Sequence, residues 1–375
     1  MKNIVGSIVE KENFFGREKE ISRAWELLND GNSLTLAAPR RVGKSSFAKK
    51  MLEIANANGW SCVDITVEGI RTEFDFFNLL GSQIADKKWY ESLKNRLKEL
   101  KISVKDIGIE WESEKSQIYL DIENKLDHRK DTLIFIDELT IFLNNLRKDK
   151  NGLDDVENFL EWLRRQRFIQ GSKIRWIFCN SIGIENFTSK HKLSKYINTL
   201  TDFKLDELKG EEPVLFIKEL AKSKKIDFPD DVIQGMLDKL NWNLPYFIQV
   251  LFKEIIDLYE IDGEKISIET VGKAYNNLIN STYFNTWDER LSDFPDDEKY
   301  TRLILDELSK SKNGVSRNVL QGLIFKRIND EDKTNKILTQ LLTRLKNDGY
   351  ITMNEKKHAF RSPLLRDFWY NRFVL

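Results

Sequence analysis

The chain has 375 residues, enough for two or three domains. Its 60 Lys and Arg balance its 60 Asp and Glu, which excludes a uniformly polycationic nucleic-acid coat and an acidic disordered chain. The two cysteines, Cys62 and Cys179, form neither a disulfide framework nor a CxxC pair, as is typical of proteins in a reducing compartment. No leader sequence and no uncharged apolar run of membrane-spanning length is visible, so we expect a cytoplasmic protein without membrane contact.

Short apolar segments alternate with helical patterns through the first part of the chain. Strands are predicted at residues 33–38, 61–67, 132–136, 175–179 and 201–205. Helices are predicted at residues 45–57, 73–101, 114–129 and 155–169. Strands separated by helices favour a parallel sheet covered on both faces. We therefore expect an α/β domain over residues 1–205.

The rest of the chain is mainly helical. Helices are predicted at residues 211–224, 230–241, 245–261 and 267–280, followed by a connector at 285–297. Further helices are predicted at residues 299–310, 316–327 and 333–348, before short strands at 350–353 and 358–361. Three helices followed by a β-hairpin is the order of a winged helix. We expect a helical domain with its connector over residues 206–298 and a winged helix over 299–375.

A phosphate-binding loop is predicted between the first strand and the helix after it. Its candidate phosphate contacts are Ala38, Pro39, Arg40, Arg41, Val42, Gly43, Lys44, Ser45 and Ser46. Gly43 lets the backbone turn so that N–H groups point at phosphate oxygens. Lys44 can reach the β- and γ-phosphates, the Ser45 hydroxyl can ligate Mg²⁺, and Ser46 can bond the α-phosphate. Ala38 stands where the pattern usually has its first glycine, which is tolerable if its φ is negative.

A second motif ends the third predicted strand. The apolar residues 133–136 lead into Asp137 and Glu138, at the sheet edge where open α/β sheets bind ligands. Asp137 can hold magnesium and Glu138 can polarise the attacking water; two solvated acids after a strand are the alternative. Asn180 follows the fourth strand, where it can bond the γ-phosphate or the water. A helix-capping role for Asn180 or Ser181 is equally open.

Three further segments resemble AAA+ P-loop ATPases, and among them the STAND-like archaeal-type ATPases with a C-terminal winged helix. They are FFGREKE at residues 14–20, NWNLPY at 241–246 and RSPLLRDFW at 361–369. Asn243 stands where these families usually have glycine. The resemblance implies ATP or ADP with Mg²⁺ bound between an α/β core and a helical lid. It implies that Phe15 and Gly16 contact the adenine and that Pro245 approaches the nucleotide from the lid. Arg17 would pair with a carboxylate or reach the ligand.

The resemblance also implies the activity, an ATPase that works as a molecular switch. Residues 190–198 contain lysines but no arginine to act as a finger, so we expect slow turnover. Arg164, Arg165 and Arg167 on the preceding helix could act in a neighbouring subunit, or form the basic end of a surface helix. The predicted role is to reposition the winged helix and control a partner protein or a second copy of the chain, in prokaryotic regulation or defence. A nucleotide-binding scaffold with negligible hydrolysis is an alternative.

Basic charge is concentrated in the predicted winged helix. Residues 299–375 contain 16 Lys and Arg against 8 Asp and Glu. Lysines at the predicted recognition helix and the wing tip could contact DNA phosphates, namely Lys333, Lys336, Lys356 and Lys357. Asp330, Glu331 and Asp332 at the start of that helix would repel phosphate. A DNA-binding ATPase of replication, transposition or repair is therefore also an alternative, and docking of a protein is the competing interpretation of this surface.

Overall fold

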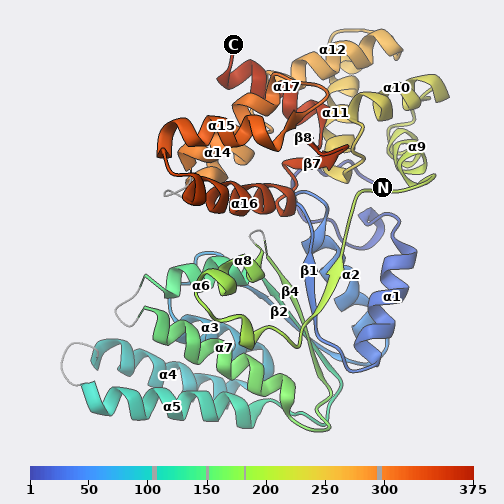
Figure 1. The fold of residues 1–375 in the computed structure, drawn as a ribbon. Helices are drawn as coiled ribbons and strands as arrows, with labels where there is room; N and C mark the ends of the chain where they lie inside the picture. The colour runs from blue at the N-terminus through green and yellow to red at the C-terminus, as the bar shows by residue number, and fades with distance from the viewer. Residues whose placement is uncertain (104–107, 149–151, 181–182, 294–297) are drawn as a thin grey trace. The chain divides into compact units, whose positions relative to one another are not determined.

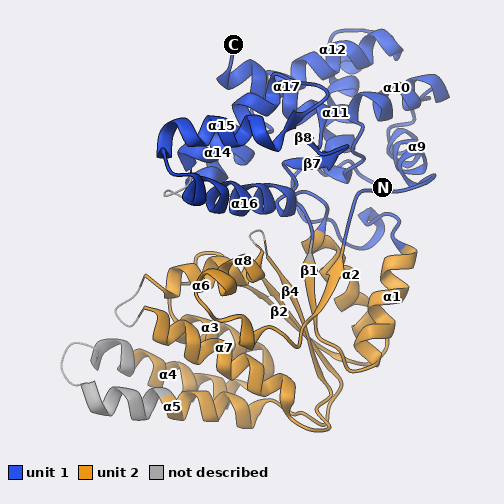
Figure 2. Cartoon of the chain, viewed as in Figure 1, with its two compact units in different colours: residues 1–17, 38–43, 205–375 blue, residues 18–37, 44–204 orange. Residues whose placement is uncertain are grey.

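The computed structural model describes residues 1–103, 108–148, 152–180, 183–293 and 298–375. The chain forms two compact units, drawn in different colours in Figure 2. Unit 1 comprises residues 1–17, 38–43 and 205–375, and unit 2 comprises residues 18–37 and 44–204. Among the described residues, no helix has both the length and the apolar character needed to cross a bilayer.

Unit 2 is built on a parallel sheet with the strand order β2-β3-β4-β1-β5. The strands are β1 (Leu34–Ala37), β2 (Ser61–Thr66), β3 (Thr132–Asp137), β4 (Ile174–Cys179) and β5 (Thr201–Lys204), which confirms the five predicted strands. Every residue of β3 is buried, as expected for a strand covered on both faces. Asp137 at its carboxyl end lies in register with Thr66 of β2 and Cys179 of β4, so these strands end at one edge.

Helices cover both faces of this sheet (Figure 1). On one face lie α1 (Glu18–Asn29) and α2 (Lys44–Ala57). On the other lie α3 (Glu73–Ile84), α4 (Lys87–Ser103), α5 (Gly108–Lys125), α6 (Leu139–Leu146), α7 (Leu153–Phe168) and α8 (Ile184–Lys190). One apolar cluster joins these six helices to alternate residues of β2, β3 and β4, because successive side chains of a strand point to opposite faces.

The prediction of a single helix over residues 73–101 was wrong, because the structure has two helices there, α3 and α4. Ala85 is extended, with φ −118° and ψ 158°, and ends α3. The Asp86 carboxylate then accepts a hydrogen bond from the Trp89 backbone N–H at 3.0 Å, which is how an Asp cap starts a new helix. The short helices α6 and α8 were not predicted.

The first part of unit 1 after residue 205 is helical. It contains α9 (Glu212–Lys224), α10 (Asp230–Leu240), α11 (Pro245–Glu260) and α12 (Ile268–Ile279), as predicted. The predicted connector is partly folded, because α13 (Asn285–Glu289) and the 3₁₀ turn η3 (Arg290–Asp293) occupy it and Trp287 is fully buried. Its remaining residues 294–297, with Pro295, lie outside the described residues. A 3₁₀ turn, η1 (Lys11–Asn13), lies in the N-terminal segment.

The chain ends in the predicted winged helix. Its elements are α14 (Glu298–Ser309), β6 (Val315–Ser316), α15 (Arg317–Ile328), α16 (Glu331–Asn347), β7 (Ile351–Asn354), β8 (Lys357–Phe360) and α17 (Pro363–Phe373). The three strands form an antiparallel sheet in the order β6-β8-β7. β6 was not predicted, because a strand of two residues has no measurable alternation.

Candidate functional site

Unit 2 brings together the predicted phosphate and metal residues at the carboxyl end of β3. The Ser45 hydroxyl in the first turn of α2 hydrogen-bonds to the Asp137 carboxyl group. Asp137 is 7% exposed, and this burial raises its pKa to about 6, against the opposing effects of Ser45 and the Lys44 charge. Ser46 is buried in the same turn. A hydroxyl, a carboxylate and a lysine therefore converge where the sequence predicts the phosphates.

Glu138 has a constrained backbone at this edge. It is the cap residue of α6 and lies in the left-handed region, with φ 62° and ψ 34°. Its N–H donates to the Cys179 carbonyl of the neighbouring strand at 2.9 Å. Such a conformation costs a residue other than glycine of the order of 1–3 kcal/mol. The β3–α6 junction thus holds a half-buried carboxylate directly beside Asp137.

Asn180 shows features of both roles that the sequence left open. Its Oδ1 accepts hydrogen bonds from the Thr140 backbone N–H and from the Thr140 hydroxyl, each at 2.9 Å. It therefore caps the first turn of α6 from the neighbouring strand. Its Nδ2 is buried and has no hydrogen-bond partner among the residues that the structure describes, so it could donate to a ligand. Ser181 lies outside the described residues, and Thr140 is a site residue that the sequence analysis missed.

The first part of the phosphate-binding loop belongs to unit 1. Gly43 has φ +94°, which a residue with a Cβ rarely adopts. The described residues with positive φ do not include Ala38. Ala38 therefore has the negative φ that an alanine needs in place of the usual glycine. The Arg41 guanidinium lies 4.4 Å from the Tyr246 ring centroid and donates to the Gly6 carbonyl at 3.2 Å. These contacts hold the loop in place through residues that lie far away in the sequence.

Pro39 and Arg40 connect the loop to the C-terminal half of unit 1. The Arg40 guanidinium donates to the Thr286 carbonyl at 3.1 Å. Gly349, in the turn between α16 and β7, has φ +84°, and a Cβ placed there would lie 2.6 Å from the Pro39 Cβ. The turn after α16 therefore packs directly on the loop. Nothing in the sequence signals Thr286 or Gly349, because both contacts join residues more than two hundred positions apart.

Arg17 stabilises the loop through backbone carbonyls. Its side chain is 3% exposed and donates to the carbonyls of Val42 at 2.9 Å and Asp206 at 2.8 Å. Its own N–H donates to the Glu212 carboxylate at 2.9 Å. Gly16 and Arg17 both have positive φ, 66° and 67°. A carboxylate partner or contact with the ligand was predicted for the Arg17 side chain, and both alternatives stay predictions; Glu212 contacts the Arg17 backbone.

Phe15 is held by packing against another ring, and Pro245 is held by its position in a helix. The Phe15 ring lies 5.1 Å from that of Phe216 in α9. Pro245 occupies the first turn of α11, a position that suits its missing N–H. Next to it, the Asn243 N–H donates to the Glu207 carboxylate at 2.7 Å. The roles of Phe15, Gly16 and Pro245 toward a base stay predictions.

The donor set at Asp137 fits magnesium. Mg²⁺ prefers oxygen ligands and usually takes one or two from protein, with water and phosphate oxygens completing its shell. The Ser45 hydroxyl and the buried Asp137 carboxyl group supply two such oxygens in contact with each other. Within the described residues, no group of three or more His, Cys, Asp and Glu forms a metal cage of its own. The site therefore suits a metal that arrives with a phosphate ligand.

Comparison with solved structures places this fold in a known class. The Walker-type ATPase PABY2304 of Pyrococcus abyssi is 16% identical, with a TM-score of 0.63 over 98% of this chain and 99% of its own. The Aeropyrum pernix ORC2 protein, solved in ADPNP–ADP complexes, is 13% identical, with a TM-score of 0.54 over 96% of each chain. No protein-family model matches the chain, and no protein with a curated description does. The likeness shows the fold, which is the AAA+ fold followed by a helical region and a winged helix.

Proposed function

We propose that this protein binds ATP with Mg²⁺, hydrolyses it slowly, and works as a STAND-like switch whose winged helix controls a partner protein or a second copy. The observation that carries the proposal is the contact between Ser45 and Asp137, beside Glu138, at the carboxyl end of β3. The AAA+ fold and the glycine of the loop at φ +94° support it.

Each residue has a distinct part in the proposed reaction. Lys44 offsets the negative charge of the β- and γ-phosphates. Ser45 and Asp137 would hold Mg²⁺, which withdraws charge from the phosphate oxygens when bound. Glu138 accepts a hydrogen bond from the attacking water and orients it in line with the γ-phosphorus. Asn180 donates through its buried Nδ2, which has no partner in the described part of the chain, to that water or to a γ-phosphate oxygen.

Contacts within unit 1 support the proposed switch. Pro39 and Arg40 belong to the phosphate-binding loop and contact Gly349 and Thr286. A change of the loop on loss of the γ-phosphate would therefore alter the packing of the α16–β7 turn. This is how an effect of nucleotide state on the winged helix would arise.

Phosphate release from Mg·ATP, measured together with binding of a fluorescent ATP analogue, tests the enzymatic part. Lys44→Ala should abolish both signals, whereas Glu138→Gln should keep binding and reduce turnover at least about a hundredfold. Glu68→Gln is the matched control, since Glu68 is an exposed carboxylate just beyond the end of β2. Equal turnover by wild type and Glu138→Gln would contradict the assigned role. If the wild-type protein binds the ATP analogue tightly but releases no phosphate, the nucleotide-binding scaffold becomes the favoured function.

A DNA-coupled ATPase is the second candidate, favoured by the net charge of +8 on residues 299–375. It predicts that duplex DNA raises phosphate release severalfold and that this stimulation falls steeply with salt. If duplex DNA does not change the rate of phosphate release even at low salt concentration, this candidate is excluded.

A further inference from the structure

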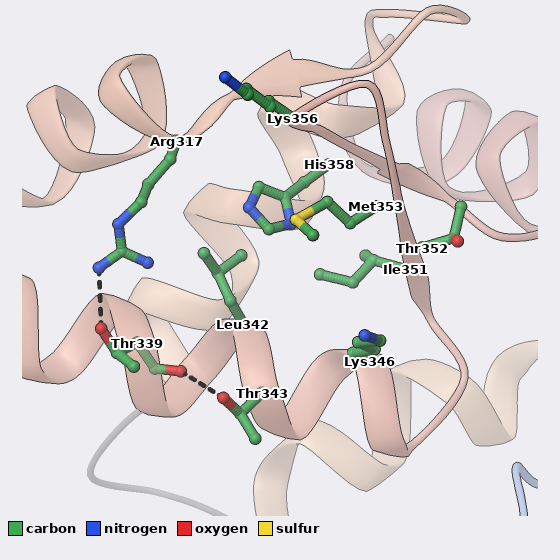
Figure 3. A pocket seen from close by; sticks show the side chains of 10 residues that line it. All are labelled: Arg317, Thr339, Leu342, Thr343, Lys346, Ile351, Thr352, Met353, Lys356 and His358. Atoms are coloured by element: carbon green, nitrogen blue, oxygen red, sulfur yellow. Dashed lines mark hydrogen bonds between the residues drawn. The ribbon is translucent and has the colours of Figure 1, made fainter.

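The winged helix contains a hollow of about 350 Å³ between α16 and the β7–β8 hairpin (Figure 3). We call it the wing hollow. Its lining residues are Arg317, Thr339, Leu342, Thr343, Lys346, Ile351, Thr352, Met353, Lys356 and His358. All of these lie in unit 1, between residues 317 and 358.

The ionisable lining residues carry one sign of charge. They are two lysines, an arginine and a histidine, with no carboxylate among the lining residues. Lys346 and Lys356 are exposed. Arg317 is held toward the hollow by donating to the Thr339 hydroxyl at 2.8 Å, as Figure 3 shows. Burial and the charges of Arg317 and Lys346 lower the pKa of His358, as expected in a positive field. An anionic group placed here would be attracted from several directions.

The floor of the hollow is apolar. Leu342 and Ile351 are 5% and 1% exposed, whereas Met353 is 53% exposed. Met353 lies directly opposite His358 across the hairpin, so both side chains occupy the same face. Met is a flexible, polarisable side chain that adapts to a bound apolar group. The hollow therefore offers an apolar contact surrounded by positive charge.

We propose that the wing hollow binds an acidic peptide segment of a partner protein, with one apolar side chain on Met353 and flanking carboxylates on the surrounding cations. Charge complementarity and the apolar floor together define this chemistry. The inference rests on the proposed function, because it supplies the partner that the switch would control.

Nucleic acid fits the same surface less well. The exposed Met353 offers no favourable contact to the phosphates of a duplex. Single-stranded nucleic acid usually stacks its bases on aromatic rings, and no Phe, Tyr or Trp lines the hollow. The helix that would enter a DNA groove begins with the carboxylates of Glu331 and Asp332, both exposed. These charges oppose a phosphate backbone, and neither residue lines the hollow.

Fluorescence polarisation of the full chain with a labelled peptide DDELFDED tests the proposal without nucleotide, so its result is independent of ATP hydrolysis. Lys356→Glu should weaken binding about tenfold, through a lost attraction and a new repulsion. Lys357→Glu is the matched control with the same charge change. Lys357 pairs with Asn354 and so points to the opposite face from Met353 and His358.

A second pair of variants tests the apolar contact. Met353→Gln should also weaken binding about tenfold, whereas Phe325→Gln, at an exposed apolar residue of α15 outside the hollow, should not. A peptide with Ser in place of Leu and Phe should bind at least about tenfold more weakly than the parent.

Three results would overturn the proposal. The first is an absence of peptide binding by wild type. The second is equal weakening by Lys356→Glu and Lys357→Glu, which would indicate general charge attraction. The third is duplex DNA that binds more tightly than the peptide and loses affinity with Lys356→Glu, which would assign the hollow to nucleic acid.

Discussion

Asp137 is held in an environment that disfavours its charge. Its ordinary pKa is 3.8, and burial raises this to about 6 in the folded protein. Because the folded state binds this proton more tightly than the unfolded state, Asp137 lowers the stability of the metal-free protein as pH rises from about 4 to 6. The cost then stays constant at neutral pH. It is the expected price of keeping a carboxylate ready for a cation.

Asp137→Asn should therefore stabilise the metal-free protein at pH 7 by about 2–3 kcal/mol, from 1.36 kcal/mol for each pKa unit. Asn keeps an oxygen for the Ser45 hydroxyl and removes the buried charge. Urea unfolding in EDTA measures the free energy of unfolding of both proteins. The difference should vanish near pH 4, and a variant less stable than wild type at pH 7 would contradict this account.

The buried Arg17 side chain stabilises the fold through its hydrogen bonds to backbone carbonyls. Arg17→Met should lower the free energy of unfolding by about 2–4 kcal/mol, because two hydrogen bonds from a buried charged group to Val42 and Asp206 are lost. Since Val42 lies in the phosphate-binding loop, nucleotide affinity should fall as well. Arg23→Met, at an exposed arginine of α1 that forms a surface ion pair with Glu26, is the control and should change neither quantity.

At the scale of elements, two helical glycines have opposite predicted effects. Gly272→Ala in α12 should raise the free energy of unfolding by about 0.5–1 kcal/mol, because a Cβ there meets nothing within 4 Å and alanine favours helix. Gly81→Ala in α3 should lower it by about 1 kcal/mol, because a Cβ there would lie 2.6 Å from the buried Leu93 side chain. Thermal or urea unfolding of both variants checks the two signs.

The sequence predicted the strands and most helices well because their signals are local. Residues 133–136 are an uninterrupted apolar run before the carboxylates of Asp137 and Glu138, and the glycine, lysine and serine of the loop follow a strand. The break at Ala85–Asp86 was missed because apolar spacing continues across it. Its signal was an aspartate three residues before Trp89, where the cap hydrogen bond forms.

The candidate site was predicted only as far as its motifs reach. Lys44, Ser45 and Asp137 were found by type and spacing, and the structure brings them together. Thr140 and Gly349 were not found, because a cap from a neighbouring strand and a close approach of two backbones leave no pattern in the sequence. Contacts of this kind depend on tertiary structure alone.

At the scale of the whole molecule, Gly349 tests whether the loop and the winged helix are coupled. Gly349→Ala should lower stability and also reduce affinity for the ATP analogue several-fold, because its Cβ would displace Pro39 of the phosphate-binding loop. Gly314→Ala is the matched control. Gly314 also has a positive φ, and its Cβ would lie 2.6 Å from the His358 carbonyl within the wing. It should lower stability while leaving nucleotide affinity unchanged; equal losses of affinity would argue against the coupling.

The division of the chain into units also has a consequence for the order of synthesis. The backbone passes between the units after residues 17, 37, 43 and 204. Residues 1–17 and 38–43 therefore leave the ribosome long before the segment with which they pack. At about 5–20 residues per second, the interval between Arg17 and Leu205 is roughly 10–40 s. The loop predicted to hold phosphates is thus among the first parts of the chain to be made and among the last to gain its neighbours.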